Sequence, residues 1–265
     1  MAQTRLLGLE SVDAKIQRAH EHLETLTASL SELGRGRKPE LILKSDGQSV
    51  SLVAYFTNPY VDLAVSTIFG DFLHNLRSSL DALIHALIRQ NRSTPSWNST
   101  FPVYAKLASF EKNTRKGTKG DVLAGVSDSA RRAVKDLQPF MRAANSVDLD
   151  PLHILNVMCN QDKHDAAHIM VGYSRDVQFA LHRSNGQLVR FASPERLVGH
   201  GPWQIPIPMP VHELEPNHRI EATGSSDFLV RTDAPWQGRA VLDLAHTLAD
   251  YVETRVIRHF AAYFK

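Results

Sequence analysis

The stretch from about Val61 to Gln90 constrains the fold more than any other part of this sequence. Its apolar residues recur three and four positions apart, which predicts one long amphipathic helix. Asn58-Pro59, just before it, supplies a capping side chain followed by a proline that suits a first helical turn. Because the apolar side of such a helix must be buried, we expect other helices to pack against it. This side consists of Phe69, Phe72, Leu73, Leu76, Leu80, Leu83, Ile84 and Leu87.

Shorter periodic segments predict those other helices. Leucines and alanines spaced three and four apart predict a helix within residues 11–33. Serine and aspartate caps predict a helix over residues 127–137, which Pro139 should end, and another over residues 151–167. A last helix should open at Asp233-Ala234-Pro235 and run toward the C-terminus.

Strands are predicted in two places by alternating apolar and polar residues. Residues 40–44 and 49–57 flank Asp46-Gly47, which predicts an early β-hairpin. Alternation returns within residues 168–232, where Asn185-Gly186 gives a second hairpin signal. This second region predicts a small antiparallel sheet before the C-terminal helix.

The fold class expected from these elements is α+β, a mainly helical bundle with the long helix, the early hairpin and the small sheet. We expect residues 1–265 to form a single domain, with residues 168–232 as an antiparallel β insertion. Pro206, Pro208 and Pro210 carry no amide hydrogen, so residues 205–211 should form an edge strand or an extended strap.

Composition excludes several classes of protein. The 265-residue chain has 30 Lys and Arg against 28 Asp and Glu, which gives no global attraction for polyanions. No stretch is apolar enough to span a bilayer, and the N-terminal apolar run is too short for a signal peptide. The single cysteine, Cys159, suits a reducing compartment. We therefore expect a soluble cytoplasmic protein with no membrane association, no cofactor and no metal, whose partners the sequence does not identify and whose homo-oligomerisation it leaves open.

Polar side chains form a stripe on each of two predicted helices. The long helix opposes its leucines with two histidines, two aspartates and no lysine or glutamate, which is unusual for a solvated face. The first stripe is Asp71, His74, Ser78, Asp81, His85 and Arg89, with Arg77 on its flank. The second stripe is His153, Asn156, Asn160, Lys163 and His164.

Two interpretations of these stripes remain open. Each stripe is a solvated helix face, or the two face each other in a polar seam that is structural or binds a small ligand or partner. The ligand-binding candidates in a seam are Asp71, His74, Arg77, Asp81, Asn156, Asn160, Lys163 and His164. Histidine and its charged neighbours can move protons, so the catalytic candidates are His74, Arg77, Asp81, His85, Lys163 and His164.

Four segments in order resemble the signatures of a group of uncharacterised bacterial and phage proteins. The group's pattern is approximately GDxLHNLRSxLD, a Phe-Pro segment, a Leu-Gln-Pro turn and a closing NxDKH. The resemblance spans about residues 65–165, implies membership of the group and implies no particular activity. Asp165 stands where the group often has a basic residue, which argues against phosphate binding there. The segments are Gly70-Asp71-Phe72-Leu73-His74-Asn75-Leu76-Arg77-Ser78-Ser79-Leu80-Asp81, Phe101-Pro102, Leu137-Gln138-Pro139 and Leu155-Asn156-Val157-Met158-Cys159-Asn160-Gln161-Asp162-Lys163-His164.

Two enzymatic alternatives rest on shorter patterns. Arg239 and His246 have the spacing of HEPN-type helical bundles, which implies a metal-independent ribonuclease acting on RNA. His164 and His168 are four residues apart and could chelate zinc in a metal-dependent hydrolase, although no third ligand is evident. Basic residues also gather in the loops 35–38 and 112–119, but neither loop has aromatic residues interleaved for base stacking, so solvated loops are expected.

Overall fold

The chain forms an α+β fold that divides into two compact units. We call Met1–Thr27, Ala64–Ala166 and Leu244–Lys265 the helical unit, and Ala28–Leu63 and Ala167–Asp243 the β unit. The computed structural model describes residues 8–35, 38–58, 61–142, 145–162, 169–172, 178–192, 201–207, 209–214, 218–223, 227–230, 236 and 238–264.

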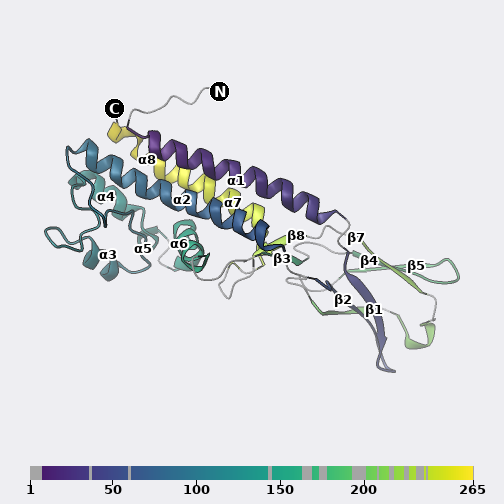
Figure 1. Ribbon diagram of the computed structural model, residues 1–265. Coiled ribbons are helices and arrows are strands. Elements are labelled where there is room, and N and C mark those ends of the chain that lie inside the picture. Colours follow the sequence, from purple (N-terminus) through teal and green to yellow (C-terminus); the bar gives the residue numbers. More distant parts are fainter. Residues whose placement is uncertain are drawn as a thin grey trace. The chain divides into compact units, whose positions relative to one another are not determined.

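Three long helices run alongside one another in the helical unit (Figure 1). They are α1 (Glu10–Gly34), α2 (Leu63–Gln90) and the C-terminal helix, which begins as α7 (Val241–Asp250). The C-terminal helix continues through a π-helical stretch, η3 (Tyr251–Ile257), and then through α8 (Arg258–Phe260) and η4 (Ala261–Phe264). All eight apolar residues predicted for the inner side of the long helix are buried. The prediction of a long helix with other helices packed on its apolar side is confirmed.

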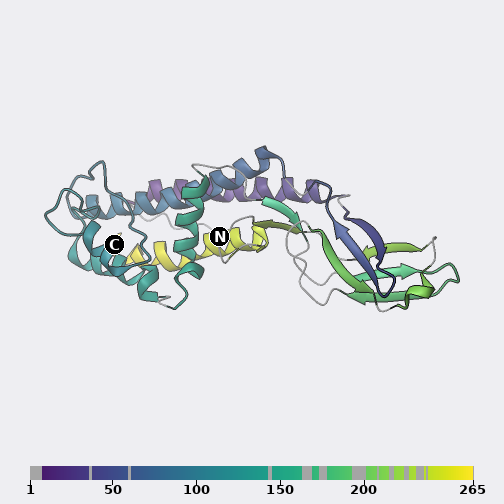
Figure 2. The ribbon, with the colours of Figure 1, turned by 90° about the horizontal axis from the view of Figure 1, so that it is seen from below.

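Shorter helices between α2 and α7 complete the helical unit, and Figure 2 shows α6 crossing α2 and α7. The Ser127 hydroxyl accepts a hydrogen bond from the Ala130 amide, as its predicted capping role requires. Pro139 does more than end α4, because it also begins α5. These elements are α3 (Leu107–Asn113), α4 (Asp128–Asp136), α5 (Pro139–Arg142), η1 (Val147–Leu149) and α6 (Pro151–Asp162).

The strands of the β unit form three small antiparallel sheets. Both predicted hairpins are confirmed, and Gly47 and Gly186 hold the positive φ angles that their turns need. The sheets have the orders β1-β2-β6, β3-β8 and β5-β4-β7. The bounds are β1 (Glu40–Ser45), β2 (Val50–Tyr55), β3 (Ile169–Gly172), β4 (Gln178–His182), β5 (Leu188–Ala192), β6 (Trp203–Ile207), η2 (Val211–Glu213), β7 (Arg219–Thr223) and β8 (Asp227–Val230).

The strands within residues 168–232 belong to three sheets, whereas the sequence predicts one small sheet. The early hairpin is not separate from the later strands, because β2 pairs with β6 and places Ser51 opposite Pro206. β6 is an edge strand, which suits Pro206, the one proline within it.

Element ends account for the remaining differences. The last helix begins at Val241, after Ala240 has formed a bridge with Leu229, and the predicted start at Asp233-Ala234-Pro235 lies outside the described residues. The predicted end of α6 near Ala167 also lies outside them. No helix in the described part of the chain is long and apolar enough to cross a membrane.

Candidate functional site

Gly70 of α2 lies against Asp162 at the end of α6. A Cβ atom at this position would lie 2.6 Å from each carboxylate oxygen of Asp162. One helical turn further along α2, His74 Nε2 lies 3.0 Å from Asp162 Oδ2. The side chains of His74 and Asp162 are 39% and 15% exposed, respectively. Because Gly70 has no side chain, the Asp162 carboxylate has room beside α2 and can contact His74.

Arg77 and Asp81 hold the Phe-Pro segment against α2. Arg77 Nη1 donates to Asp81 Oδ1 at 2.6 Å, and Arg77 Nη2 donates to the Phe101 carbonyl at 2.8 Å. The same oxygen of Asp81 accepts from the Thr100 hydroxyl at 2.6 Å and from the Phe101 amide at 2.9 Å. The pair thus fixes both backbone groups of Phe101, whose ring is completely buried.

Gln138 fixes the other side of this segment. Its buried side-chain amide donates to the carbonyl oxygens of Pro102 at 2.8 Å and Val134 at 3.1 Å. Its side-chain oxygen accepts from the Tyr104 amide at 3.1 Å. A buried amide needs such partners, and here they are backbone groups of the Phe-Pro segment and of α4. Arg77, Asp81 and Gln138 therefore join three of the four motif segments in one hydrogen-bonded cluster.

Among the described residues, the first stripe contacts the end of α6 through His74, and its partner there, Asp162, belongs to neither stripe. The contact is formed by His74 and Asp162, whereas Asp81 contacts the segment at Thr100 and Phe101. The sequence signal for Asp162 is its place as the aspartate of the NxDKH pattern, since it lies outside both polar stripes.

Other predicted site residues are placed as follows. Asp71 and Asn160 are exposed, and Asn156 is partly buried. Neither amide side chain forms a hydrogen bond among the residues that the structure describes. His85 Nε2 lies 3.0 Å from the carbonyl oxygen of Ser99. Lys163 and His164 lie outside the described residues.

The Arg and the His of the ribonuclease alternative do not lie on the same element. His246 is exposed on α7, but Arg239 precedes that helix and its carbonyl accepts the Val230 amide. The Arg and His of the proposed ribonuclease pattern therefore do not share a helix. Of the zinc candidates, His164 and His168 fall outside the described residues. Among the side chains that are described, no group of three His, Cys, Asp or Glu could hold a metal ion.

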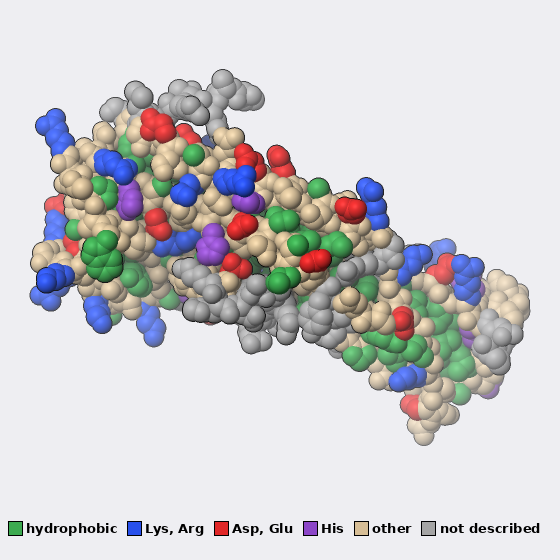
Figure 3. All heavy atoms as spheres, viewed as in Figure 1, with side chains coloured by type: hydrophobic (Ala, Val, Ile, Leu, Met, Phe, Trp, Pro, Cys, Tyr) green, Lys and Arg blue, Asp and Glu red, His purple; other side chains and the backbone are tan. Residues whose placement is uncertain are grey.

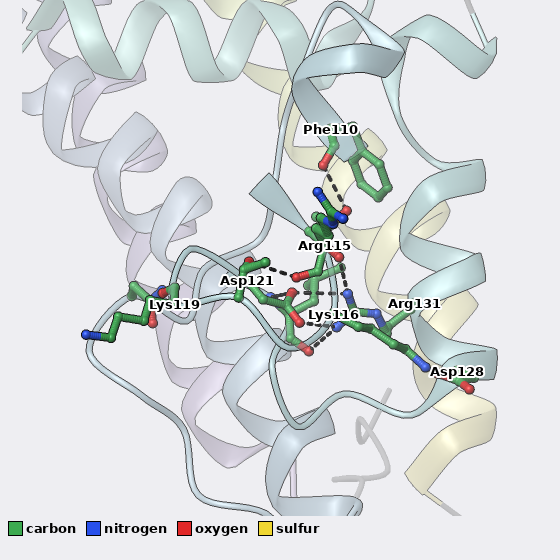
Figure 4. Close-up of polar contacts among 11 residues, drawn as sticks. Phe110, Arg115, Lys116, Lys119, Asp121, Asp128 and Arg131 are labelled. Atoms are coloured by element: carbon green, nitrogen blue, oxygen red, sulfur yellow. Dashed lines mark hydrogen bonds and ion pairs between the residues drawn. The ribbon is translucent and has the colours of Figure 1, made fainter. Parts of the chain in front are cut away.

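A basic pocket of about 410 Å³ lies between α3, α4 and the loop that joins them. Arg131 builds its wall, because its guanidinium donates to both oxygens of Asp121 at 3.0 and 3.1 Å and to the Leu123 carbonyl at 2.6 Å. It also donates to the Thr114 carbonyl (Figure 4). The lining residues are Phe110, Glu111, Thr114, Arg115, Lys116, Leu123, Asp128, Arg131, Arg132 and Lys135.

Positive charge is in excess around this pocket. Its lining contains five Lys or Arg side chains and two carboxylates. Lys116 donates a hydrogen bond to Asp128 and thereby holds the pKa of that carboxyl below its ordinary value, with smaller contributions from Arg131 and Arg132. Arg115 forms no ion pair with any described residue. Figure 3 shows Lys and Arg side chains gathered at the end of the helical unit that carries α3 and α4.

Comparison of the chain with models of protein families, with curated proteins and with solved structures found no match.

Proposed function

We propose that this protein acts by binding, that its polar seam is structural, and that its ligand is a phosphate-bearing anion held in the pocket between α3 and α4. The structural role of the seam is supported by the partners that its charged groups already have. Arg77 and Asp81 direct their hydrogen bonds to each other and to Thr100 and Phe101. A catalytic acid or base must instead reach a reactant.

The observation that carries the proposal is the charge of the pocket lining. Five cationic side chains and two carboxylates line the pocket. Lys116 pairs with Asp128, Lys135 with Glu111 and Arg131 with Asp121, so the excess positive charge rests on Arg115 and Arg132. Guanidinium groups match the geometry of phosphate oxygens and can bind them through two parallel hydrogen bonds. Arg115 and Arg132 are exposed at this pocket and are therefore placed to meet a phosphate from solvent.

Long-chain inorganic polyphosphate is the probe for this proposal, because it offers phosphate charge without bases or sugars. In isothermal titration calorimetry, the Kd for polyphosphate should rise as salt is added, because binding releases counterions. The Arg115→Glu/Arg132→Glu variant should lose most of the affinity. The control is Lys38→Glu/Lys44→Glu, which changes the net charge equally at exposed positions of the β unit. Equal losses in both variants would show that the attraction has no particular site and would overturn the proposal.

The ribonuclease alternative is tested in the same preparation. Labelled RNA should remain intact during incubation with the protein in EDTA. If the protein cleaves the RNA and His246→Ala abolishes this cleavage, the protein is a ribonuclease and the binding proposal is wrong. Zinc retained through purification, measured by elemental analysis, would instead favour the metal-dependent hydrolase.

Two further proposals concern origin and compartment. We propose membership of the bacterial and phage group described above, and the hydrogen bonds that Arg77, Asp81 and Gln138 make to the Phe-Pro segment support it, because they give a physical reason for these motifs to occur together. We also propose a cytoplasmic protein, which the single buried Cys159 supports.

A further inference from the structure

Trp97 is the most exposed large apolar side chain in the described part of the chain, at 97% exposure. It lies at the tip of a turn whose hydrogen bonds fix its backbone. The Ser96 amide donates to Ser99 Oγ at 2.9 Å, and the Ser99 amide donates to the Ser96 carbonyl at 3.1 Å. The Ser96 hydroxyl also donates to Asn98 Oδ1 at 2.6 Å. An ordered turn therefore presents an indole ring to solvent.

This turn is joined to the basic loop between α3 and α4. The side-chain amide of Asn98 donates to the Lys119 carbonyl at 3.1 Å, and the Thr100 amide donates to the Val122 carbonyl at 3.4 Å. The Lys119 side chain points away from the Arg131 cluster (Figure 4). Trp97 and Lys119 thus belong to neighbouring turns that a hydrogen bond connects.

The chain around Trp97 is strongly basic. Residues 89–119 contain seven Lys or Arg and a single acidic residue, Glu111. All seven cationic residues are exposed. They are Arg89, Arg92, Lys106, Lys112, Arg115, Lys116 and Lys119.

We infer that this surface binds single-stranded nucleic acid, with a base stacked on the Trp97 ring and the phosphates on the Lys and Arg side chains of residues 112–119. The inference rests on the proposed function and names the class of phosphate-bearing ligand. An exposed aromatic ring beside cationic side chains is the combination by which proteins bind single strands without reading their sequence. Duplex DNA keeps its bases stacked inside the helix and would leave the indole ring without a partner.

The inference is tested with fluorescein-labelled oligothymidine and with a duplex of the same length, by fluorescence anisotropy. Oligothymidine should bind more tightly than the duplex. Trp97→Ala should weaken binding to oligothymidine by roughly 5- to 150-fold, the range expected for one stacked base. Trp97→Phe should keep most of the affinity because it keeps an aromatic face. Leu188→Ala, at another exposed apolar position, is the control and should change nothing.

Polyphosphate separates the failure of this inference from the failure of the proposed function. Trp97→Ala should leave polyphosphate binding unchanged, whereas Arg115→Glu/Arg132→Glu should weaken both ligands. If Trp97→Ala leaves oligothymidine binding unchanged while the arginine variant weakens it, the inference is wrong and the proposed function stands. If the arginine variant binds oligothymidine and polyphosphate as tightly as the unmodified protein does, the inference and the proposed function are both wrong. A dimer in sedimentation that Trp97→Ala dissociates, with oligothymidine binding intact, would overturn the inference in favour of contact with a second copy of the chain.

Discussion

Arg131→Met should destabilise the helical unit more than any single change at the exposed cations beside it. The arginine side chain is 12% exposed and its partner Asp121 is 4% exposed, so the pair is largely removed from water. The substitution keeps an unbranched apolar stem but removes the donors to Asp121, Leu123 and Thr114. One hydrogen bond to Asp121, from the Leu123 amide at 3.1 Å, would remain.

The magnitude follows from the charge that is left behind. Removing one partner of a buried ion pair typically costs about 3–5 kcal/mol, because the remaining charge loses its compensation. We therefore expect the free energy of unfolding to fall by roughly this amount in urea denaturation followed by circular dichroism. Arg132→Met, at the next residue, is the matched control and should change the free energy by only about 0.5 kcal/mol, because its side chain is exposed.

A double-mutant cycle tests the cause as well as the size. Arg131→Met/Asp121→Leu removes both charges, so it should recover much of the stability that Arg131→Met loses, with a coupling energy of at least about 1 kcal/mol. Additive effects of the two changes, or an Arg131→Met protein as stable as the Arg132→Met control, would refute the reasoning.

Two further predictions concern the α2–α6 contact and the pocket rim. Gly70→Ala should destabilise the protein by about 1–3 kcal/mol in thermal denaturation, because its Cβ would overlap the Asp162 carboxylate. In an Asp162→Ala background the same change should stabilise by up to about 1 kcal/mol, since alanine favours helix; effects of equal sign would contradict the argument. Lys116→Met should raise the pKa of Asp128 toward its ordinary value in a carboxyl NMR titration. The stabilising effect of this pair is present above the unfolded-state pKa of Asp128 and is lost as the pH falls through the lowered folded-state pKa. The pKa of Asp46, lowered by amide groups of its own turn, should not move, and a parallel change would refute the assignment to Lys116.

Elements with a local cause could be predicted from the sequence. The apolar side of α2 and the turns at Gly47 and Gly186 depend on residues a few positions apart. The pairing of β2 with β6 joins residues about 150 positions apart in the chain, and periodicity cannot specify which distant strand supplies a partner. α7 begins at Val241, directly after the β-bridge between Ala240 and Leu229, and a local proline signal cannot indicate such a bridge.

A polar stripe on a largely buried helix needs partners, but the sequence could not name the partners of the stripe on α2. Asp81 bonds to a backbone amide of Phe101, and Gln138 bonds to a backbone carbonyl of Pro102. Backbone donors and acceptors occur at almost every residue, so they leave no signature in the sequence. Asp162 was overlooked for a different reason: its contact with α2 depends on a missing side chain at Gly70.

An aromatic residue outside a basic segment can lie on a turn that the fold connects to that segment, as Trp97 does. The basic loop 112–119 contains no aromatic residue, and on that ground the sequence predicts a solvated loop. The hydrogen bond from Asn98 to the Lys119 carbonyl connects that loop to the turn that carries Trp97, which is 15 or more residues away in the sequence. Stacking and phosphate contact require only that ring and cations share a surface, and a hydrogen-bonded pair of turns provides this as well as an interleaved segment would. The aromatic criterion therefore has to be applied to the folded surface as well as to the segment itself.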